Sequence, residues 1–417
     1  MRFLRDRDPY KVYIYTNFLS ALIFTFIFTV NLLYHVQIVR LDPLQLVLVG
    51  TVLELTVFLF EIPTGVVADL KSRKLSIIIG YFLIGSGFLI EGLFPLFVTV
   101  IISQVLWGIG YTFTSGAQQA WIADEIGEKE ASAAFVKGAR AGNLGRIIAI
   151  PLSIGVGYFM VNLPILLGGI GMLLLAVLLI RYMKEENFYP ANKEERDSTW
   201  SHLKKNMKNI IRYSKASFLL RILFLIALLF GLYSEGFDRL WMTHFIDAAN
   251  LSKFTDSQLV IFMGAIEFVI VLFSFITLHL ISRSTIYERR KQIYIALFIG
   301  SFIIISSLLG FAFSTLVIGL LVFYMLIQIC RHTMEPLVDV WLNQLIVDSK
   351  TRASFFSVKG QIDAIGQISG GPVIGLIATK LAIRTAFVCC AILLSPVLVL
   401  YYLIVKKDKD FNNKTSG

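Results

Sequence analysis

The chain has 417 residues, of which 56% are hydrophobic and only 16% are charged, and its formal net charge is +10. A soluble domain has roughly a quarter of its residues charged, so this composition excludes a soluble globular protein and indicates a bilayer as the solvent. The rule that cations stay on the inner side of a membrane accounts for the positive charge, so we expect no nucleic-acid partner.

Twelve mostly apolar runs, each long enough to span a bilayer as a helix, follow one another along the chain. We predict spanning helices over residues 11–35, 43–67, 75–94, 96–123, 136–159, 163–182, 217–238, 256–281, 292–313, 315–342, 355–379 and 384–405. No small-residue cleavage site follows the first run, which is therefore interpreted as a spanning helix and not as a signal peptide.

Basic residues gather on alternate sides of these runs. Lys and Arg are frequent at the amino terminus, in 71–74, in 181–221, in 283–291 and in the tail, whereas 92–95 and 161–164 have none. The positive-inside rule then places both termini and the central polar stretch in the cytoplasm of a multi-pass protein of the cell (plasma) membrane.

The second run has one face that is both small and acidic. Gly50, Glu54, Glu61 and Gly65 fall within a stripe of about 60° on a helix. Glu54 lies roughly 16 Å from Pro43 along the helix axis, near mid-bilayer. A carboxyl held out of water favours its neutral form, so Glu54 is a candidate for proton coupling or substrate contact, with a permanent internal ion pair as the alternative.

The second run ends in GVVADLKSRK, residues 65–74, where an acid and three cations follow a small-residue patch. Asp69 can accept hydrogen bonds from the free amides at the amino terminus of a neighbouring helix. Arg73 can pair with an acid at the end of the fourth run, for which Asp124 is well placed. The alternative is plain topology, with cations including Lys74 retained on the inner side.

The fifth run contains Arg146 near mid-depth. Because arginine keeps its charge, Arg146 needs an acidic partner or an anionic ligand, and Glu54 is a candidate for the partner. Aromatic side chains that could line an apolar drug pocket are Phe24, Phe28, Tyr111, Phe113 and Tyr233.

The only long polar stretch, residues 181–215, divides the runs six and six. We therefore predict an amino-terminal six-helix bundle (1–182), a cytoplasmic linker (183–216), a carboxy-terminal six-helix bundle (217–407) and a cytoplasmic tail (408–417). In the linker, apolar residues from Trp200 to Ile211 recur at helical spacing among lysines. This pattern favours an amphipathic helix on the membrane surface over a solvated basic linker.

In the second half, the seventh run ends in YSEGFDRLW, where Glu235 and Arg239 can pair and Asp238 is left over. The eighth run has Glu267 at mid-depth. The tenth run places five polar side chains on one helix face: Gln328, Arg331, His332, Glu335 and Asp339. A face this polar cannot contact lipid, so it lines either a transport cavity or a buried structural network.

Matching segments recur in the same order in both halves. QQAWIADE (118–125) resembles VDVWLNQ (338–344), and SAAFVKGARAGNLG (132–145) resembles SFFSVKGQIDAIG (354–366). The predicted fold is therefore an all-α membrane protein with twelve transmembrane helices in two pseudo-symmetric six-helix bundles, an arrangement typical of transporters.

No phosphate loop, HExxH motif or Cys/His ligand cluster occurs in the sequence. We therefore expect a protein that is not an enzyme and that uses no metal or cofactor. Any uphill transport would be driven by an ion gradient or by the membrane potential, which leaves a small-molecule substrate, protons and the lipid bilayer as the expected partners.

The segment GVVADLKSRK resembles the signature of the major facilitator superfamily between its second and third helices. Gly65, Asp69, Arg73 and Lys74 match, whereas Leu70 and Ser72 depart from the usual basic residue and glycine. The resemblance implies the twelve-helix fold of that superfamily. It also implies a cytoplasmic latch that includes Glu61, Gly65, Asp69, Arg73, Lys74 and Asp124, in which Asp69 accepts hydrogen bonds from the amino terminus of the eleventh helix, here beginning near Ser354.

Two segments, LELTVFLFEIPTGVVAD and LWGIGYTFTSGAQQAWIADE, are similar to the third drug:proton antiporter group, whose members are tetracycline-resistance-like or macrolide-efflux-like. This resemblance implies a monomeric antiporter that exports amphiphilic drugs and contributes to antibiotic resistance. Gln104 stands where many drug antiporters have an arginine, and the fifth run lacks their Gly-Pro pair. The alternative is a transporter of a specific, possibly anionic, metabolite that Arg146 or Arg331 binds.

Overall fold

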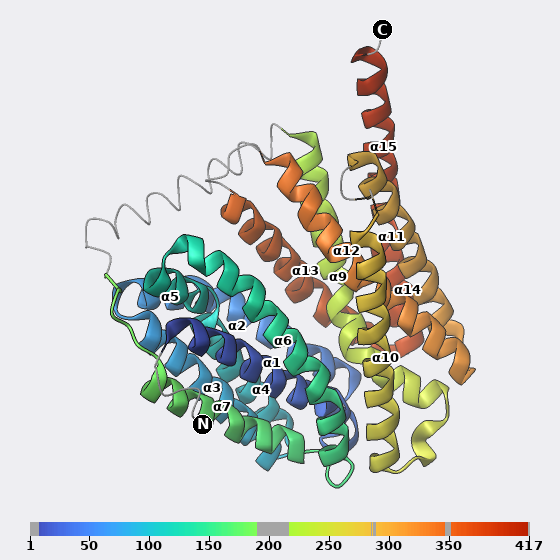
Figure 1. Cartoon of the computed structure of the whole chain (residues 1–417). Helices are drawn as coiled ribbons and strands as arrows, with labels where there is room; N and C mark the ends of the chain where they lie inside the picture. The colour runs from blue at the N-terminus through green and yellow to red at the C-terminus, as the bar shows by residue number, and fades with distance from the viewer. Residues whose placement is uncertain (1–7, 190–216, 285, 287–288, 347–351, 416–417) are drawn as a thin grey trace. The chain divides into compact units, whose positions relative to one another are not determined.

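A computed structural model describes residues 8–189, 217–284, 286, 289–346 and 352–415, and these residues form helices and short connections without a strand (Figure 1). The predicted surface helix near Trp200 lies outside the described residues. Two compact units emerge from the packing: residues 1–41, 52–197 and 254–267 form the first, and residues 42–51, 198–253 and 268–417 form the second. The helices α2 and α10 each contribute one segment to each unit.

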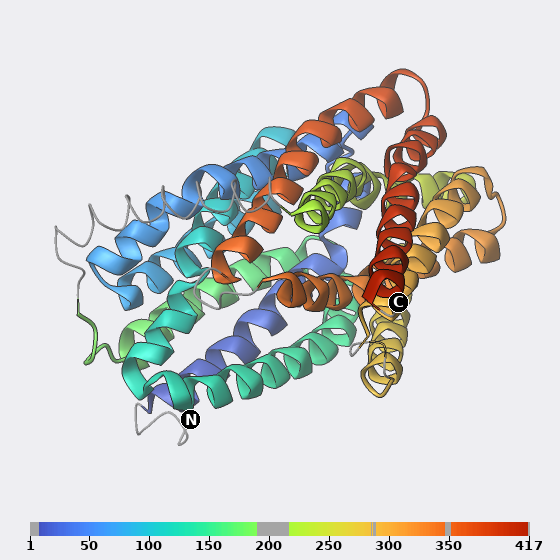
Figure 2. The same cartoon turned by 90° about the horizontal axis from the view of Figure 1, so that it is seen from above.

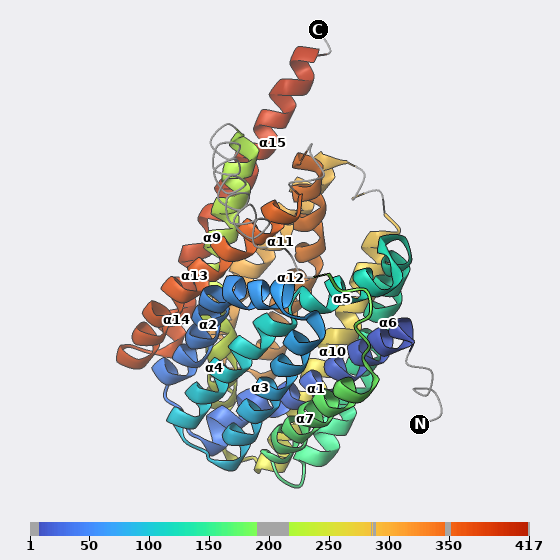
Figure 3. The same ribbon diagram turned by 90° about the vertical axis from the view of Figure 1, so that its left-hand side faces the viewer.

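The first unit is built from helices of the amino-terminal half. They are α1 (Pro9–Leu33), the π-helical turn η2 (Tyr34–Ile38), most of α2 (Pro43–Leu70), α3 (Arg73–Leu93), α4 (Phe97–Thr114), α5 (Ala117–Ile126), α6 (Glu128–Gly157) and α7 (Leu163–Tyr182). Helix α3 lies between α4 and α7, and α1 packs along α6 (Figure 3).

The second unit is built from helices of the carboxy-terminal half. They are α9 (Phe218–Ala248), the 3-10 turn η3 (Leu251–Lys253), most of α10 (Asp256–Ser282), α11 (Arg290–Phe313), α12 (Val317–Leu345), α13 (Arg352–Lys380), α14 (Ile383–Leu394) and α15 (Pro396–Thr415). Figure 2 shows the red α15 beside the gold α11, and the two helices are in contact.

Among the described residues, eleven helices are long and apolar enough to cross a membrane. Helix α6 is as long as 30 residues but is not one of them, because Lys137, Arg140 and Arg146 interrupt its apolar side chains. The predicted spans agree with the helices to within a few residues at most ends. Helix α9 is the clearest exception, since it continues to Ala248 and not to 238.

Breaks between helices follow the local chemistry. Gly116 separates α4 from α5 with a φ of 72°, and Gly127 separates α5 from α6 with a φ of 87°. These angles lie in the left-handed region, which glycine adopts without the steric cost of a Cβ atom. Pro396 has no backbone N–H and starts α15 directly after the end of α14.

Small residues let the helices approach closely in both units. A Cβ atom on Gly80 would lie 2.6 Å from the Gly110 carbonyl oxygen, where α3 meets α4. On α9, a Cβ atom on Gly231 would lie 2.1 Å from the Asp363 carbonyl oxygen of α13. Such contacts are the usual way that spanning helices gain packing, because lipid supplies no hydrophobic drive between them. The second contact brings the polar residues of α9 and α13 together.

Candidate functional site

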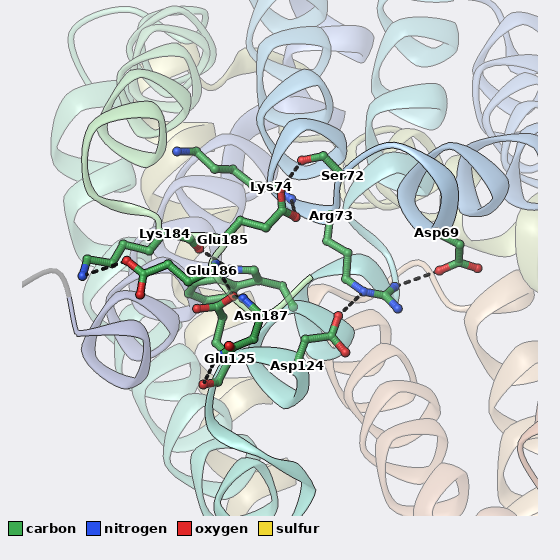
Figure 4. Close-up of polar contacts among 11 residues, drawn as sticks. Asp69, Ser72, Arg73, Lys74, Asp124, Glu125, Lys184, Glu185, Glu186 and Asn187 are labelled. Carbon is green, nitrogen blue, oxygen red and sulfur yellow. Dashed lines mark hydrogen bonds and ion pairs between the residues drawn. The ribbon is translucent and has the colours of Figure 1, made fainter. Parts of the chain in front are cut away.

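Arg73, the first residue of α3, contacts two carboxylates (Figure 4). Its Nε donates to Asp124 Oδ2 at 2.5 Å, and its Nη1 donates to Asp69 Oδ1 at 2.8 Å. The Arg73 side chain is 20% exposed, Asp124 is 32% exposed and Asp69 is 53% exposed, so the pair with Asp124 is better shielded from water. The signature loop thus joins the end of α2, the start of α3 and helix α5.

The remaining part of the latch prediction concerns Asp69 and the amino terminus of α13, which belong to different units. It stays a prediction. Gly65 has open space where a Cβ atom would stand, with no atom of the described residues within 4 Å. Lys74 Nζ donates a hydrogen bond to the Ile180 carbonyl oxygen at 3.3 Å.

Glu185, in the segment after α7, also binds the signature loop, and the sequence did not predict this contact. Its carboxylate accepts the Lys74 backbone N–H at 2.9 Å and the Ser72 hydroxyl, while Ser72 Oγ accepts the Leu75 N–H at 2.9 Å (Figure 4). Ser72 and Glu185 therefore satisfy amides at the start of α3 that have no partner inside the helix. Ser72, which departs from the family signature, is the N-cap of α3.

The segment after α7 is held on α5 as well. Glu125 accepts the backbone N–H groups of Glu186 at 2.8 Å and Asn187 at 3.0 Å, and Trp121 Nε1 donates to the Lys184 carbonyl oxygen at 2.7 Å. The chain that leaves the sixth spanning helix is thereby tied to the signature loop.

Helix α2, which carries the acidic stripe, packs against α4, where a Cβ atom on Gly108 would lie 2.9 Å from the Thr56 side chain. Glu61 is exposed and Glu54 is half-buried. Among the described residues, no ion pair joins Glu54 to Arg146, so the structure does not show the predicted pairing.

A cavity of about 550 Å³ lies in the first unit between α1, α4 and α6. Phe24, Phe28, Trp107 and Tyr111 form its aromatic wall, and three of these residues were expected from the sequence. The rings of Phe28 and Trp107 are 4.9 Å apart, and Phe24 stacks on Phe28 at 5.9 Å. A volume of this size suits a drug-sized organic molecule.

Polar side chains also line this cavity. Asn17, Ser20, Asn143 and Arg146 contribute amide, hydroxyl and guanidinium groups. Among the described residues, no hydrogen bond or ion pair of the Arg146 side chain occurs. The cavity therefore combines an aromatic wall with a cation that can attract an anionic group.

A second cavity, of about 600 Å³, lies in the second unit between α9, α12 and α13. Asp238, Arg331, His332 and Glu335 line it, as the prediction for α12 and the end of α9 requires. Lys359 and Asp363 of α13 also line it. Lys359 and Asp363 were not predicted as site residues. Their segment, 354–366, was interpreted only as a repeat of segment 132–145 in the first half.

Arg331 and Asp238 form the central ion pair of this cavity. Arg331 Nη2 donates to Asp238 Oδ2 at 2.7 Å, and Nη1 donates to Asp238 Oδ1 in parallel. The paired geometry fixes the guanidinium and the carboxylate in one plane and gives both charges a partner. Asp238, left over by the local pairing of Glu235 with Arg239, thus finds its counter-ion on α12.

Two further polar residues of α12 have partners on neighbouring helices. Asp339 Oδ1 accepts Lys359 Nζ at 2.6 Å, and His332 Nδ1 lies 3.0 Å from Ser274 Oγ of α10. Glu335 is exposed in the cavity. The polar face of α12 therefore combines a cavity wall with a network of ion pairs, the two alternatives that the sequence left open.

Glu235 pairs with Arg239 as the spacing predicts, with Arg239 Nε donating to Glu235 Oε1 at 2.8 Å. This pair is buried beside Gly50 at the start of α2 and is not part of the cavity wall. Glu267 belongs to the first unit, is half-buried and does not line the cavity there. In the described part of the chain, no group of three His, Cys, Asp or Glu side chains could hold a metal ion.

Comparison with known proteins agrees with this architecture. The chain is 26% identical over 389 residues to the uncharacterized MFS-type transporter YxaM of Bacillus subtilis (strain 168), covering 88% of this chain and 90% of YxaM. Among solved structures, the nucleoside transporter NupG has a TM-score of 0.72 at 14% identity, covering 95% of this chain and 98% of NupG.

Two further solved structures have the same fold. A peptide transporter POT in complex with sulfate has a TM-score of 0.69 at 16% identity, covering 96% of this chain and 94% of its own. A bacterial homolog of the human lysosomal transporter Spinster has a TM-score of 0.68 at 15% identity, covering 96% of this chain and 95% of its own. The sequence profile described as Major Facilitator Superfamily matches residues 14–330, which is more than half of the chain. The protein therefore belongs to the major facilitator superfamily and is a multi-pass membrane transporter of small molecules.

Proposed function

We propose that the protein exports amphiphilic organic compounds, such as tetracycline- or macrolide-like drugs, in exchange for protons. The observation that carries this proposal is the cavity of the first unit, of about 550 Å³, which Phe24, Phe28 and Trp107 line together with Asn143 and Arg146. Aromatic rings bind flat apolar groups, and a few polar groups orient the molecule.

Proton exchange is supported by carboxyl side chains that lie within the spanning helices. Glu54 is half-buried in α2, and Asp363 and Glu335 line the cavity of the second unit. A carboxyl that loses contact with water takes up a proton, and a change in protonation alters which conformation of a transporter is favoured. Alternating access, the usual mechanism of such two-bundle transporters, can use that preference to couple the proton to the cargo.

Inverted membrane vesicles that contain the protein provide the test. A pH gradient with the acidic side inside should drive accumulation of tetracycline or ethidium, and a protonophore should abolish it. Trp107→Ala should lower the apparent affinity by about 5-fold to 150-fold, because it removes aromatic contacts worth roughly 1–3 kcal/mol.

Phe159→Ala is the matched control, because Phe159 is an aromatic residue of the same unit that lies outside the cavity wall. It should leave uptake unchanged. Uptake of both compounds that ignores the gradient in the wild type would contradict proton-driven drug export.

Transport of an anionic metabolite is the second candidate. The observation that favours it is the guanidinium of Arg146, which has no hydrogen bond or ion pair among the described residues and lines the cavity. Arg331 is less suited to this role because Asp238 already neutralises it. An organic acid such as succinate or glutamate that binds at Arg146 should raise the melting temperature of the purified protein. Arg146→Ala should remove this stabilisation, whereas Arg140→Ala, which changes an exposed arginine of the same helix, should retain it. Equal stabilisation of both variants would argue against binding at Arg146.

A further inference from the structure

Glu91 is a carboxylate with no exposed surface in the last turn of α3. Three side chains reach it: Asn31 Nδ2 donates to Oε1 at 2.6 Å, His35 Nε2 lies 2.8 Å from the same oxygen, and Gln104 Nε2 lies 3.5 Å from Oε2. His35 is only 1% exposed. A buried acid and a buried imidazole thus share one contact in the first unit, and neither belongs to the candidate residues described above.

The backbone is built around this contact. His35 lies in η2, where α1 continues as one π-helical turn, and π-helical turns are rare and often mark functional sites. Tyr34, the residue before it, donates its hydroxyl to the Glu91 carbonyl oxygen at 2.6 Å. The turn therefore holds two consecutive side chains against the end of α3.

The network can hold one proton more or one proton less without losing its hydrogen bonds. When Glu91 is ionised, its oxygens accept from Asn31, His35 and the amide nitrogen of Gln104. When Glu91 is protonated, its hydroxyl can donate to Gln104 Oε1, which has no partner in the described residues, after the amide turns over. His35 Nδ1 is likewise buried without a partner there, so the imidazole can gain or lose its proton at that atom.

The surroundings leave the pair to balance its own charge. Tyr34 is a further titratable group that contacts Glu91, from η2, and the uncharged Gln104 faces it from α4. Around the neighbouring Gly92, the α7 side contributes Asn162, Ile165 and Leu166. Arg40, the nearest cation along the chain after His35, is exposed. Because an unpaired buried charge is costly, the pair should hold a proton until water reaches it.

An aromatic layer connects this network with the cavity of the first unit. Each of three helices supplies one network residue and, three positions away, one ring: Asn31 and Phe28 on α1, Glu91 and Phe88 on α3, and Gln104 and Trp107 on α4. The Phe88 ring lies 5.7 Å from both Phe28 and Trp107. Phe28 and Trp107 also line the cavity, so a molecule bound there contacts the rings that pack against Phe88, three residues from Glu91 on α3.

We propose that Glu91 and His35, with Asn31 and Gln104, form the proton-binding site of the first unit, and that the layer of Phe28, Phe88 and Trp107 transmits its protonation state to the cavity. The site lies about 27 Å along α3 from Arg73, given a rise of about 1.5 Å per residue, and so at the opposite end of that helix from the signature loop. The coupling to cargo rests on the proposed transport function, whereas proton binding does not.

The test separates these two parts. Infrared difference spectra of the purified protein between acidic and alkaline pH should show the carbonyl band of a buried protonated carboxyl. Glu91→Gln should remove the band, and His35→Gln, which keeps an amide donor but cannot titrate, should shift the pH at which it appears. Glu128→Gln, which changes an exposed acid of the same unit, is the matched control and should retain the wild-type band. Gel filtration identifies any variant that does not fold. If Glu91→Gln does not fold, the pH at which the band appears in His35→Gln tests the proposal in its place.

Ethidium uptake into inverted vesicles supplies the second measurement. The ratio of uptake with and without a pH gradient should fall to about 1 in Glu91→Gln while ethidium binding is retained. A carboxyl band that persists in Glu91→Gln overturns the proton site. A band that disappears, together with a wild type that moves no ethidium or tetracycline, supports the proton site and contradicts drug export instead.

Discussion

At the scale of single residues, Gly50 leaves the least room for a Cβ atom among the described glycines of the second unit. A Cβ atom there would lie 1.4 Å from Glu235 Oε1 and 2.5 Å from Arg239 Nε. Both atoms belong to a buried ion pair, so they cannot move into water without losing their partner. The small residue that the stripe of α2 places here is therefore required by the pair on α9.

Gly50→Ala should lower the free energy of unfolding by about 1–3 kcal/mol, because the added methyl group overpacks the site and separates Glu235 from Arg239. The melting temperature of the protein in detergent measures this effect. Gly155→Ala in α6 is the control, since nothing lies within 4 Å of the position of its Cβ atom. Equal melting temperatures for the two variants would contradict this account of Gly50.

The ion pair of Asp238 and Arg331 should couple energetically. Asp238→Asn and Arg331→Gln should each destabilise the protein, and the double variant should be less destabilised than the sum of the two. A double-mutant cycle by chemical denaturation in detergent should give a coupling of about 1–3 kcal/mol. Strictly additive effects would mean that the pair contributes nothing beyond its separate charges.

Residue pairs show what the sequence could and could not predict. Glu235 with Arg239, and Arg73 with Asp124, followed from helical spacing or from a known signature. The partner of Arg331 did not follow, because it depends on the register between α9 and α12, which local spacing does not determine. Glu91 and His35 were missed since each is a single polar residue near the end of an apolar run, and only the packing brings them together.

At the scale of elements, the composition predicted the helices well because lipid requires every backbone group to be paired inside the helix. Helix α6 shows the limit of hydropathy: its charges remove it from the eleven apolar helices, although its apolar positions predicted a span at 136–159. The ends of helices were less predictable. Helix α9 continues past a polar segment because Glu235, Asp238 and Arg239 all have partners in the fold.

Glu185 should stabilise the start of α3 and the segment that follows α7. In Glu185→Gln, the backbone amides of residues 184–189 should exchange with solvent about tenfold faster, because a cap of this kind contributes about 0.5–2 kcal/mol. Hydrogen exchange followed by mass spectrometry measures this change. Lys71→Gln, an exposed substitution beside the same loop, should leave the exchange of this segment unchanged. Equal exchange in both variants would show that Glu185 does not hold the segment.

At the scale of the whole molecule, the charge distribution predicts the topology. In a protein whose three cysteines are replaced by alanine, Ser132→Cys at the start of α6 should resist a membrane-impermeant maleimide in intact cells. Phe159→Cys, just beyond the other end of α6, should react readily, since Phe159 is 81% exposed. Labelling of Ser132→Cys before lysis would place the termini outside the cell and reverse the predicted orientation.

The division of α2 and α10 between the two compact units also bears on how the chain could be cut. Residues 42–51 pack within the second unit and residues 254–267 within the first. Each of these two equivalent helices therefore has one segment in the unit that the other half of the chain mainly forms. If the polypeptide were cut within 190–216, each fragment would keep a short segment, 42–51 or 254–267, that packs within the unit of the other fragment. The two fragments should behave like the partners of a domain-swapped dimer, insoluble or degraded when produced alone and recovered together when co-expressed.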